Sequence, residues 1–253
     1  MQQGLSEFSG LLAIWYREFK VFTREKARVI SSVVNPLLFL VIFGAGLGSS
    51  VEVQEVTYQT FIYPGIISMA MLFTSIFYGV YIVWDKMIDF LKEVLVAPLS
   101  RTTIFLGKVL GGVTEAMIQG SILLIIGLLI GIKINLWGLP AALFIMFITA
   151  VGLVGIGLIL GSLMERPEGF QLISSFIVFP LFLLSGALFP IENLPSWLAP
   201  FTYADPLTYC VDALRSILLG TSRFPILFDL AVLLLFALGT TVLGNLSFKR
   251  MKL

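Results

Sequence analysis

Few residues in this chain of 253 are of types that carry out chemistry. Histidine is absent and Cys210 is the single cysteine, so neither histidine-based proton transfer nor a disulfide within the chain is expected. We expect no metal site, because the commonest metal ligand is missing. Gly107-Lys108 does not belong to a phosphate loop GxxxxGK[ST], since Val109 follows it and Thr102 stands where the first glycine is needed. Any nucleotide chemistry must therefore come from another chain.

Glu115 is the one carboxylate deep inside an apolar stretch. Lys108, Gly112 and Gln119 share its face of a helix. An ionisable group at membrane depth is costly and usually faces a bundle interior or a water-filled cavity. Glu115 and Gln119 are therefore candidates for a translocation path. The alternative is structural, either a hydrogen bond between helices or a Glu115–Lys108 ion pair.

An aromatic stripe is the second candidate site, formed by Phe73, Phe77, Tyr81 and Trp84. Their spacing of three to four residues places them on one face of a helix. Such a face can line a passage for amphipathic or sugar-bearing molecules. It can also face lipid, and Trp84 is typical of an anchor at the membrane interface.

The composition indicates the environment in which these residues work. The chain is 58% hydrophobic and only 12% charged, with a mean hydropathy of +1.02. Soluble proteins are about 45–50% apolar and about 25% charged, so this is a membrane protein with a single domain over 1–253. The net charge of +1 gives no reason to expect a nucleic-acid partner.

Long apolar runs predict the membrane crossings. Each crossing needs about 20 apolar residues, and backbone groups in lipid must pair internally, so the runs are helices. No alternating pattern of a membrane β-barrel is present. We predict an all-α fold with six spans, at 29–48, 60–84, 103–131, 138–163, 170–189 and 226–246.

The basic residues predict the orientation. Of the 16 Lys and Arg residues, only Lys133, Arg215 and Arg223 fall on one side of the predicted spans. Because Lys and Arg are in excess on the cytoplasmic side, both termini should be cytoplasmic. We therefore expect a multi-pass protein of the cell's inner (cytoplasmic) membrane.

Two shorter amphipathic helices are expected on the cytoplasmic side. Residues 5–28 place an apolar stripe opposite basic residues, which predicts an in-plane helix at the lipid interface. Residues 85–97, ended by Pro98, either lie on lipid or fill a groove on a cytoplasmic partner. In the second case the apolar side is the anchor and the charged side is the rim. The anchor residues would be Ile88, Leu91, Val94 and Leu95, and the rim residues Asp85, Asp89, Lys92 and Glu93.

Prolines break the apolar stretch from Ser185 to Arg215 at regular intervals. The pieces between them, Leu194 to Ala199 and Leu207 to Leu219, are too short to span a membrane. Broken helices at membrane depth are tolerated where protein or water covers them. We expect residues 190–220 to form a re-entrant pair that caps the external mouth. The gate residues would be Pro190, Pro195, Trp197, Pro206, Tyr209 and Arg215.

The stretch SGALFPIENLPSWLAPFTYADPLTYCVDALR resembles the external segment of type-2 ABC (ABC-2) exporter permeases, which include the daunorubicin-resistance and nodulation-factor exporters. Other segments resemble the family in the family order. They are WYREFKVFTREKARV, NPLLFLVIFGAGLG, FIYPGII and FLKEVLVAPLSRTTIFLGK.

This resemblance implies a half-transporter that forms a homodimer and binds two copies of a separate ATPase subunit. Residues 85–97 would be its coupling helix and the N-terminal helix its interface helix. ATP and Mg²⁺ would be used by the partner, with no cofactor bound by this chain. Relatives often carry a polar pair early in the coupling helix, where this chain has Met87-Ile88.

The expected cargo is an amphipathic compound, either a drug or a lipid-linked molecule. The alternative within the family is a polysaccharide or glycolipid, as in O-antigen and teichoic-acid permeases. An intramembrane enzyme acting on lipids would need a catalytic constellation, and Glu115 stands alone.

Overall fold

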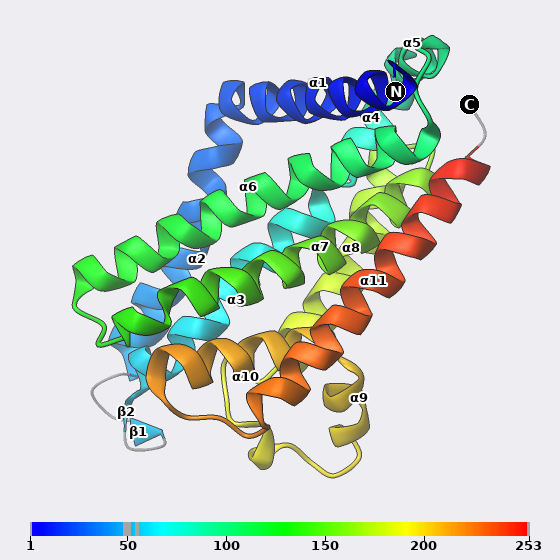
Figure 1. Ribbon diagram of the computed structural model, residues 1–253. Helices are drawn as coiled ribbons and strands as arrows, with labels where there is room; N and C mark the ends of the chain where they lie inside the picture. Colours follow the sequence, from blue (N-terminus) through cyan, green and yellow to red (C-terminus); the bar gives the residue numbers. More distant parts are fainter. Residues whose placement is uncertain (1, 48–51, 54–55, 252–253) are drawn as a thin grey trace.

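The computed structural model describes residues 2–47, 52–53 and 56–251 and is nearly all helical (Figure 1). Six long helices in this described part are apolar enough to cross a membrane. They are α2 (Lys26–Leu47), α3 (Tyr58–Phe77) continued by α4 (Val80–Met87), α6 (Arg101–Ile130), α7 (Leu139–Leu163), α8 (Pro167–Leu184) and α11 (Ile226–Arg250). The six helices confirm the number of spans predicted from the apolar runs.

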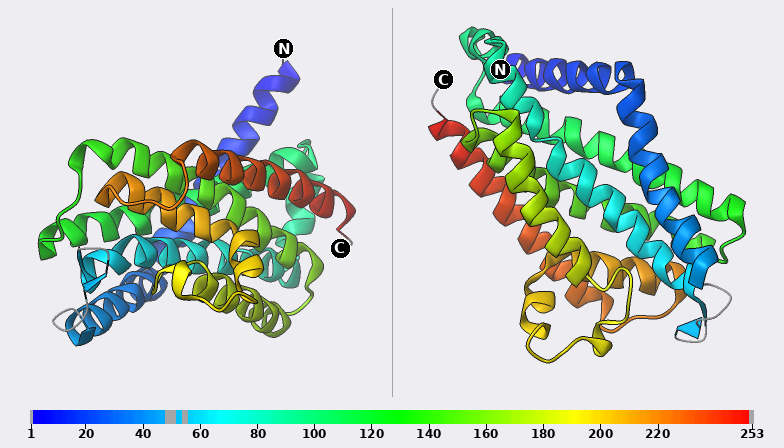
Figure 2. Two further views of the ribbon diagram at one scale, coloured as in Figure 1. Left: turned by 90° about the horizontal axis from the view of Figure 1, so that it is seen from below. Right: turned by 180° about the vertical axis from the view of Figure 1, so that it is seen from behind.

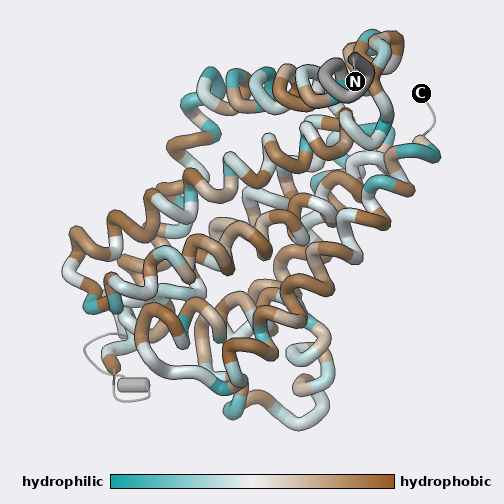
Figure 3. The backbone as a smooth tube through the Cα atoms, in the orientation of Figure 1, coloured by the Kyte–Doolittle hydropathy of each residue, from teal (hydrophilic) through white to brown (hydrophobic). Residues whose placement is uncertain are grey.

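Both termini lie at one end of the bundle, which we call the terminal end (Figure 1). Helix α1 (Gln2–Arg24) lies across this end, and the short helix α5 (Phe90–Val96) is beside its N-terminus. The opposite end carries the short elements. They are the antiparallel strands β1 (Glu52–Val53) and β2 (Val56–Thr57), the 3₁₀ turns η1 (Leu136–Gly138) and η2 (Ile191–Asn193), and the helices α9 (Ala199–Ala204) and α10 (Pro206–Leu219). Hydrophilic residues gather toward the two ends and apolar residues fill the middle (Figure 3).

Helix α3 forms the centre of the bundle. Every residue from Phe61 to Leu72 is buried, and seen from behind α3 runs between α2 and α8 (Figure 2). Helix α7 packs against it through Gly157, where an added Cβ would lie 2.5 Å from the carbonyl oxygen of Ile76. Small residues at such crossings let two membrane helices approach closely.

Prolines set the helix starts at the opposite end. Pro200 and Pro206 occupy the first turns of α9 and α10, where a fixed φ favours a helix and a backbone N–H is not needed. Asp205 caps α10 by accepting the backbone N–H of Leu207 at 2.8 Å. The first short helix is therefore Ala199–Ala204, and the predicted helix from Leu194 to Ala199 is wrong.

Candidate functional site

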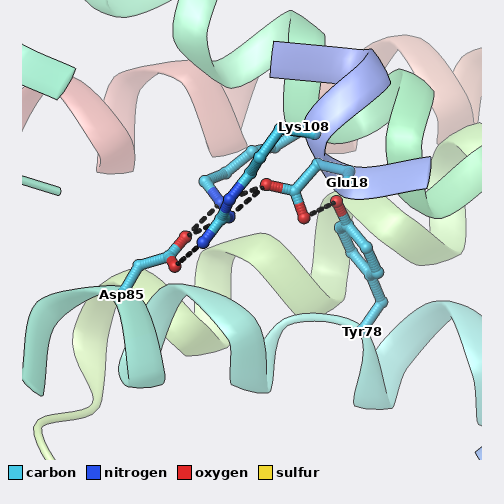
Figure 4. A network of polar contacts seen from close by, with 5 residues as sticks. Glu18, Tyr78, Asp85 and Lys108 are labelled. Atoms are coloured by element: carbon cyan, nitrogen blue, oxygen red, sulfur yellow. Dashed lines mark hydrogen bonds and ion pairs between the residues drawn. The ribbon is translucent and has the colours of Figure 1, made fainter. Parts of the chain in front are cut away.

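A buried charged cluster joins three helices at the terminal end (Figure 4). Asp85 of α4 accepts from Arg17 of α1 at 2.7 and 3.1 Å and from Lys108 of α6 at 2.6 Å. Glu18 of α1 accepts from Arg17 at 2.7 Å and from Lys108 at 3.0 Å. Its second oxygen accepts the hydroxyl of Tyr78 at 3.0 Å. Two cations thus balance two carboxylates in a closed network.

The electrostatics of the cluster stabilise its charged forms. Burial raises the pKa of the Glu18 carboxyl, but the charges of Lys108 and Arg17 outweigh burial and hold this pKa below its ordinary value. Burial lowers the pKa of Arg17, yet its contacts with Asp85 and Glu18 raise this pKa above the ordinary value. Glu18 and Arg17 therefore stay charged at neutral pH.

Glycines on α6 let α1 reach this cluster. An added Cβ at Gly107 would lie 2.9 Å from the side chain of Ile14, and one at Gly111 would lie 2.6 Å from Cβ of Glu18. Farther toward the N-terminus, the Glu7 carboxylate accepts the backbone N–H of Ser100 at 3.0 Å, at the start of α6. Helix α1 is thus fastened to α6 at both ends of their contact.

The segment predicted as one coupling helix is two helices. Asp89 has φ 56°, a left-handed conformation that separates α4 from α5. Asp85 is buried in the charged cluster and does not form part of an exposed rim. Lys86, beside it, donates to the carbonyls of Gly161, Ser162 and Met164 at 2.7–3.0 Å and so caps the C-terminal end of α7.

Two of the four predicted anchor residues, Leu91 and Val94, face inward. Leu91 is fully buried and lines a cavity of about 240 Å³ between α1, α5 and α6, together with Val94. The exposed large apolar residues described in this segment are Met87 (55% exposed), Ile88 (65% exposed) and Val96 (86% exposed). Because α1 covers Leu91 and Val94, the structure leaves Ile88 as the predicted anchor residue that is exposed. Glu93 is exposed, and the side chains of Lys92 and Leu95 lie outside the described part.

Glu115 is buried, as a residue at membrane depth should be, but its partner differs from the predicted one. Its Oε1 lies 2.6 Å from Nη2 of Arg28 on α2, and the Arg28 guanidinium stacks over the Tyr81 ring at 4.4 Å. Tyr81 in turn donates to Glu25 at 2.6 Å. The Glu115–Lys108 pair does not form, since Lys108 is held by Glu18 and Asp85.

A cavity of about 610 Å³ opens between α2, α3 and α8 and brings several of the candidate residues together. Phe73, Phe77 and Gln119 line it, while Glu115 and Tyr81 lie outside its wall. Phe73 stacks on Phe77 at 6.1 Å and meets Phe179 of α8 edge-on at 5.7 Å. Of the aromatic stripe, Phe73 and Phe77 thus line a cavity, whereas Tyr81 and the exposed Trp84 do not.

Sequence reasoning missed the wall of this cavity that α2 provides. Its polar members are Arg28, Ser31, Ser32 and Asn35. Their spacing of three, four and seven residues is that of one helix face. This periodicity at the start of the first span was the signal that could have identified them.

The gate residues do not form a single site. Arg215 is buried, stacks on the Phe61 ring at 4.0 Å and donates to the carbonyl of Gly186 at 3.1 Å. Burial lowers the pKa of Arg215 to about 10, which leaves it charged at neutral pH. Tyr209 donates to the carbonyl of Tyr203 at 2.7 Å, whereas Trp197 is exposed.

The prolines of this segment have structural positions. Pro190 caps the turn η2 and lines a small cavity of about 50 Å³ beside Arg215, and Pro206 starts α10. Pro195 accepts the backbone N–H of Leu198 in the turn before α9. In the described part of the chain, no group of three or more His, Cys, Asp or Glu residues is placed to hold a metal ion.

Comparison with known proteins agrees with this architecture. The chain is 29% identical over 260 residues to ycf38 of Cyanophora paradoxa, which is named a transport permease; the match covers 95% of this chain and 88% of the relative. It is 27% identical over 235 residues to the inner membrane transport permease YadH of Escherichia coli, covering 89% of each. It is also 25% identical over 213 residues to nodulation protein J of Rhizobium leguminosarum, covering 83% of this chain and 82% of the relative. The family model described as ABC-2 type transporter matches residues 9–219, and this chain therefore belongs to the ABC-2 type transporter family.

Proposed function

We propose that this protein is the membrane-spanning permease subunit of an ATP-driven exporter, with the cavity between α2, α3 and α8 as the site that receives its cargo. Family membership supports transport, and the relatives ycf38 and YadH are named transport permeases. Hydrolysis of ATP, with its Mg²⁺, belongs to two copies of a separate ATPase subunit, because no phosphate loop occurs in this sequence.

The observation that carries the proposal is the chemistry of the cavity wall. Phenylalanines from three helices form an apolar body, and polar residues of α2 form one end. A volume of about 610 Å³ is within the usual range of about 300–1,000 Å³ for small-molecule sites. The cavity therefore suits a single amphipathic molecule better than a polysaccharide chain. A glycolipid exporter remains the alternative, since aromatic faces also suit sugar rings.

A second copy of the chain would cover the face onto which this cavity opens. Asn35 of α2 and Gln171 of α8 are exposed within spans, and an uncovered amide in lipid is costly. By contrast, the exposed residues of α11 between Ile226 and Leu246 are all apolar or glycine. We infer that α11 faces lipid and that α2 and α8 face a partner copy in a homodimer.

The ATPase would bind the exposed apolar residues between α4 and α5, which include Ile88. In this proposal the terminal end is cytoplasmic, α1 is the interface helix at the membrane surface, and α9 and α10 are re-entrant helices at the external mouth. Exposed Lys20 and Arg24 on α1 support the first two assignments, because basic residues favour the cytoplasmic lipid surface.

The test of the proposed function is co-purification of an ATPase subunit from native membranes. Ile88→Asp should abolish co-purification, because a charge replaces an exposed apolar contact at the interface. The permease should still insert, since Ile88 packs little within its own chain. Leu136→Asp, at an exposed apolar position of η1 at the opposite end of the molecule, is the control and should retain the ATPase. An ATPase that bound the Ile88→Asp variant normally would exclude this docking surface, and the absence of any ATPase from the parent preparation would contradict the function itself.

A further inference from the structure

The cavity between α2, α3 and α8 changes in polarity along its length, and this gradient points to the class of molecule it takes. Polar groups of α2, from Arg28 to Asn35, belong to one part of its wall. Later turns of α2 contribute Phe39, Ile42 and Phe43 to the remainder. Because α2 is a continuous helix, the polar and apolar groups lie in sequence along one face. A ligand that matches this wall has a polar end and an apolar body.

The charge on the wall is already neutralised. Among the described residues that line the cavity, Arg28 is the one ionisable side chain. Its guanidinium lies 2.6 Å from Glu115 and 3.8 Å from Glu25, so no uncompensated cation is available to a ligand. A charged ligand would lose its hydration without gaining a counter-charge, which is strongly unfavourable. The polar end of the ligand should therefore be uncharged.

Gln119 supplies a hydrogen-bond donor that lacks a partner within the described chain. Its side-chain oxygen accepts the hydroxyl of Thr74, which fixes the amide. The amide nitrogen is buried and has no hydrogen-bond partner. A buried unpaired donor costs about 1–3 kcal/mol, so such groups are usually satisfied by water or by a ligand. Gln119 and Thr74 both belong to the wall of the cavity, so the unpaired nitrogen is part of a side chain that a ligand in the cavity would approach.

Aromatic rings supply flat surfaces for the apolar body. Phe73 and Phe77 stack with an interplanar angle of 27°, and Phe179 meets Phe73 at 85°. Rings arranged in this way offer both a face and an edge to a planar guest. The aliphatic residues Leu38, Ile42 and Met69 complete the apolar part of the wall.

We infer that the cargo is an uncharged amphipathic molecule with a flat apolar body and a hydrogen-bond acceptor oxygen, and that the amide nitrogen of Gln119 selects for this oxygen. This inference rests on the proposed function, in which the cavity receives the cargo. It adds the charge of the cargo, the chemical group that is recognised and the residue that recognises it.

The test uses photoreactive probes on the permease in lipid nanodiscs, with adducts mapped by mass spectrometry. Benzophenone is uncharged, has two flat aromatic rings and carries a carbonyl acceptor. Its 4-carboxyl and 4-(trimethylammoniomethyl) derivatives add a negative or a positive charge. A phenyl trifluoromethyl diazirine is uncharged and lacks an acceptor oxygen. Adducts on α11 at Leu235, which is exposed among apolar residues, serve as the internal standard for partitioning into lipid.

Benzophenone should form adducts on cavity residues of α2, α3 and α8 well above the α11 standard. Both charged derivatives should need an at least about tenfold higher concentration than benzophenone to half-saturate the cavity adducts, because the cavity offers them no counter-charge. Gln119→Leu keeps a similar shape but removes the donor. It should raise the half-saturating concentration of benzophenone about tenfold, as expected for loss of one buried hydrogen bond, and leave the diazirine unchanged.

If the Gln119→Leu variant does not fold, Gln119→Glu is the second variant, because it keeps the side-chain length. The control is Gln59→Leu, the same change at the start of α3 outside the cavity, which should leave all probes unaffected. Cavity adducts that are insensitive to both Gln119 variants, or equal labelling by the charged derivatives, would overturn this inference while leaving the cavity as a binding site. If no probe labelled the cavity above the α11 standard, the proposed cargo site would itself be wrong.

Discussion

Two adjacent residues, Asp85 and Lys86, fasten α4 to different parts of the molecule. Asp85 meets Arg17 and Lys108 on one side, and Lys86 caps the C-terminal end of α7 on the other. Sequence patterning placed Asp85 on an exposed rim because its spacing fits a charged face. The partners that bury it come from distant parts of the chain, and local periodicity cannot predict such a pairing.

Asp85→Ala should destabilise the protein strongly. It leaves the buried Lys108 and the half-buried Arg17 with Glu18 as their one remaining counter-charge, and breaking a buried charge pair costs about 3–5 kcal/mol. The melting temperature in detergent, followed by tryptophan fluorescence, should fall clearly. Exposed Glu93→Ala is the control and should change the stability by less than about 0.5 kcal/mol. Equal melting temperatures for the two variants would mean that the cluster does not hold α1 and α4 to α6.

Asp205 should make the stability depend on pH. Burial raises its pKa from 3.8 to about 8, although the backbone N–H of Leu207 opposes this. Between these values the folded protein keeps a proton that the unfolded chain releases, so stability should fall as the pH rises from about 4 to about 8. Asp205→Asn keeps the cap without a titrating group, and its melting temperature should vary less between pH 5 and pH 8. A parent and a variant with parallel pH profiles would contradict this assignment.

At the scale of elements, the number and order of the spanning helices could be predicted from the sequence. Apolar runs and prolines act locally, so they identify α2, α8 or α10 without knowledge of their neighbours. The inward side of α5 could not be predicted in this way. Leu91 is buried because α1 lies over it. The docking of α1 depends in turn on Gly107 and Gly111 of α6, which are distant from α1 in the sequence.

Gly111→Ala tests the docking of α1 on α6. The new methyl would lie 2.6 Å from Cβ of Glu18 and from the Tyr78 hydroxyl, so α1 must shift. Overpacking of this kind costs about 1–3 kcal/mol. Gly239→Ala on α11 is the matched control, because nothing lies within 4 Å of its added Cβ and alanine favours a helix. The melting temperature should fall for Gly111→Ala alone; a fall of equal size in both variants would contradict close packing at Gly111.

For the whole molecule, the distribution of exposed polar residues supports the proposal that α2 and α8 face a partner copy and that α11 faces lipid. The sequence predicted a homodimer from family resemblance, but it did not identify the face. That assignment required the structure, because only the fold places α2, which carries Asn35, and α8, which carries Gln171, on either side of α3 (Figure 2).

Cysteine cross-linking should distinguish the two sides. Phe176 on α8 and Leu235 on α11 are similarly exposed, at 73% and 72%. In a background with Cys210→Ala, Phe176→Cys should form a disulfide-linked dimer in membranes, because α8 faces its copy in the proposed homodimer. Leu235→Cys should remain monomeric on a denaturing gel. A dimer through Leu235→Cys and none through Phe176→Cys would place the interface on α11.

The most direct test of the account is ATP-dependent uptake of an uncharged amphipathic dye into inside-out vesicles that contain the permease and its ATPase. The parent should accumulate the dye when ATP is added. Asn35→Trp places a bulky side chain in the wall of the cavity and should abolish uptake. Because Asn35 is exposed, the variant should still fold and the ATPase should still co-purify. Leu235→Trp adds the same bulk on α11 and should transport like the parent. Uptake by Asn35→Trp at the parental rate would contradict the claim that cargo passes through the cavity between α2, α3 and α8.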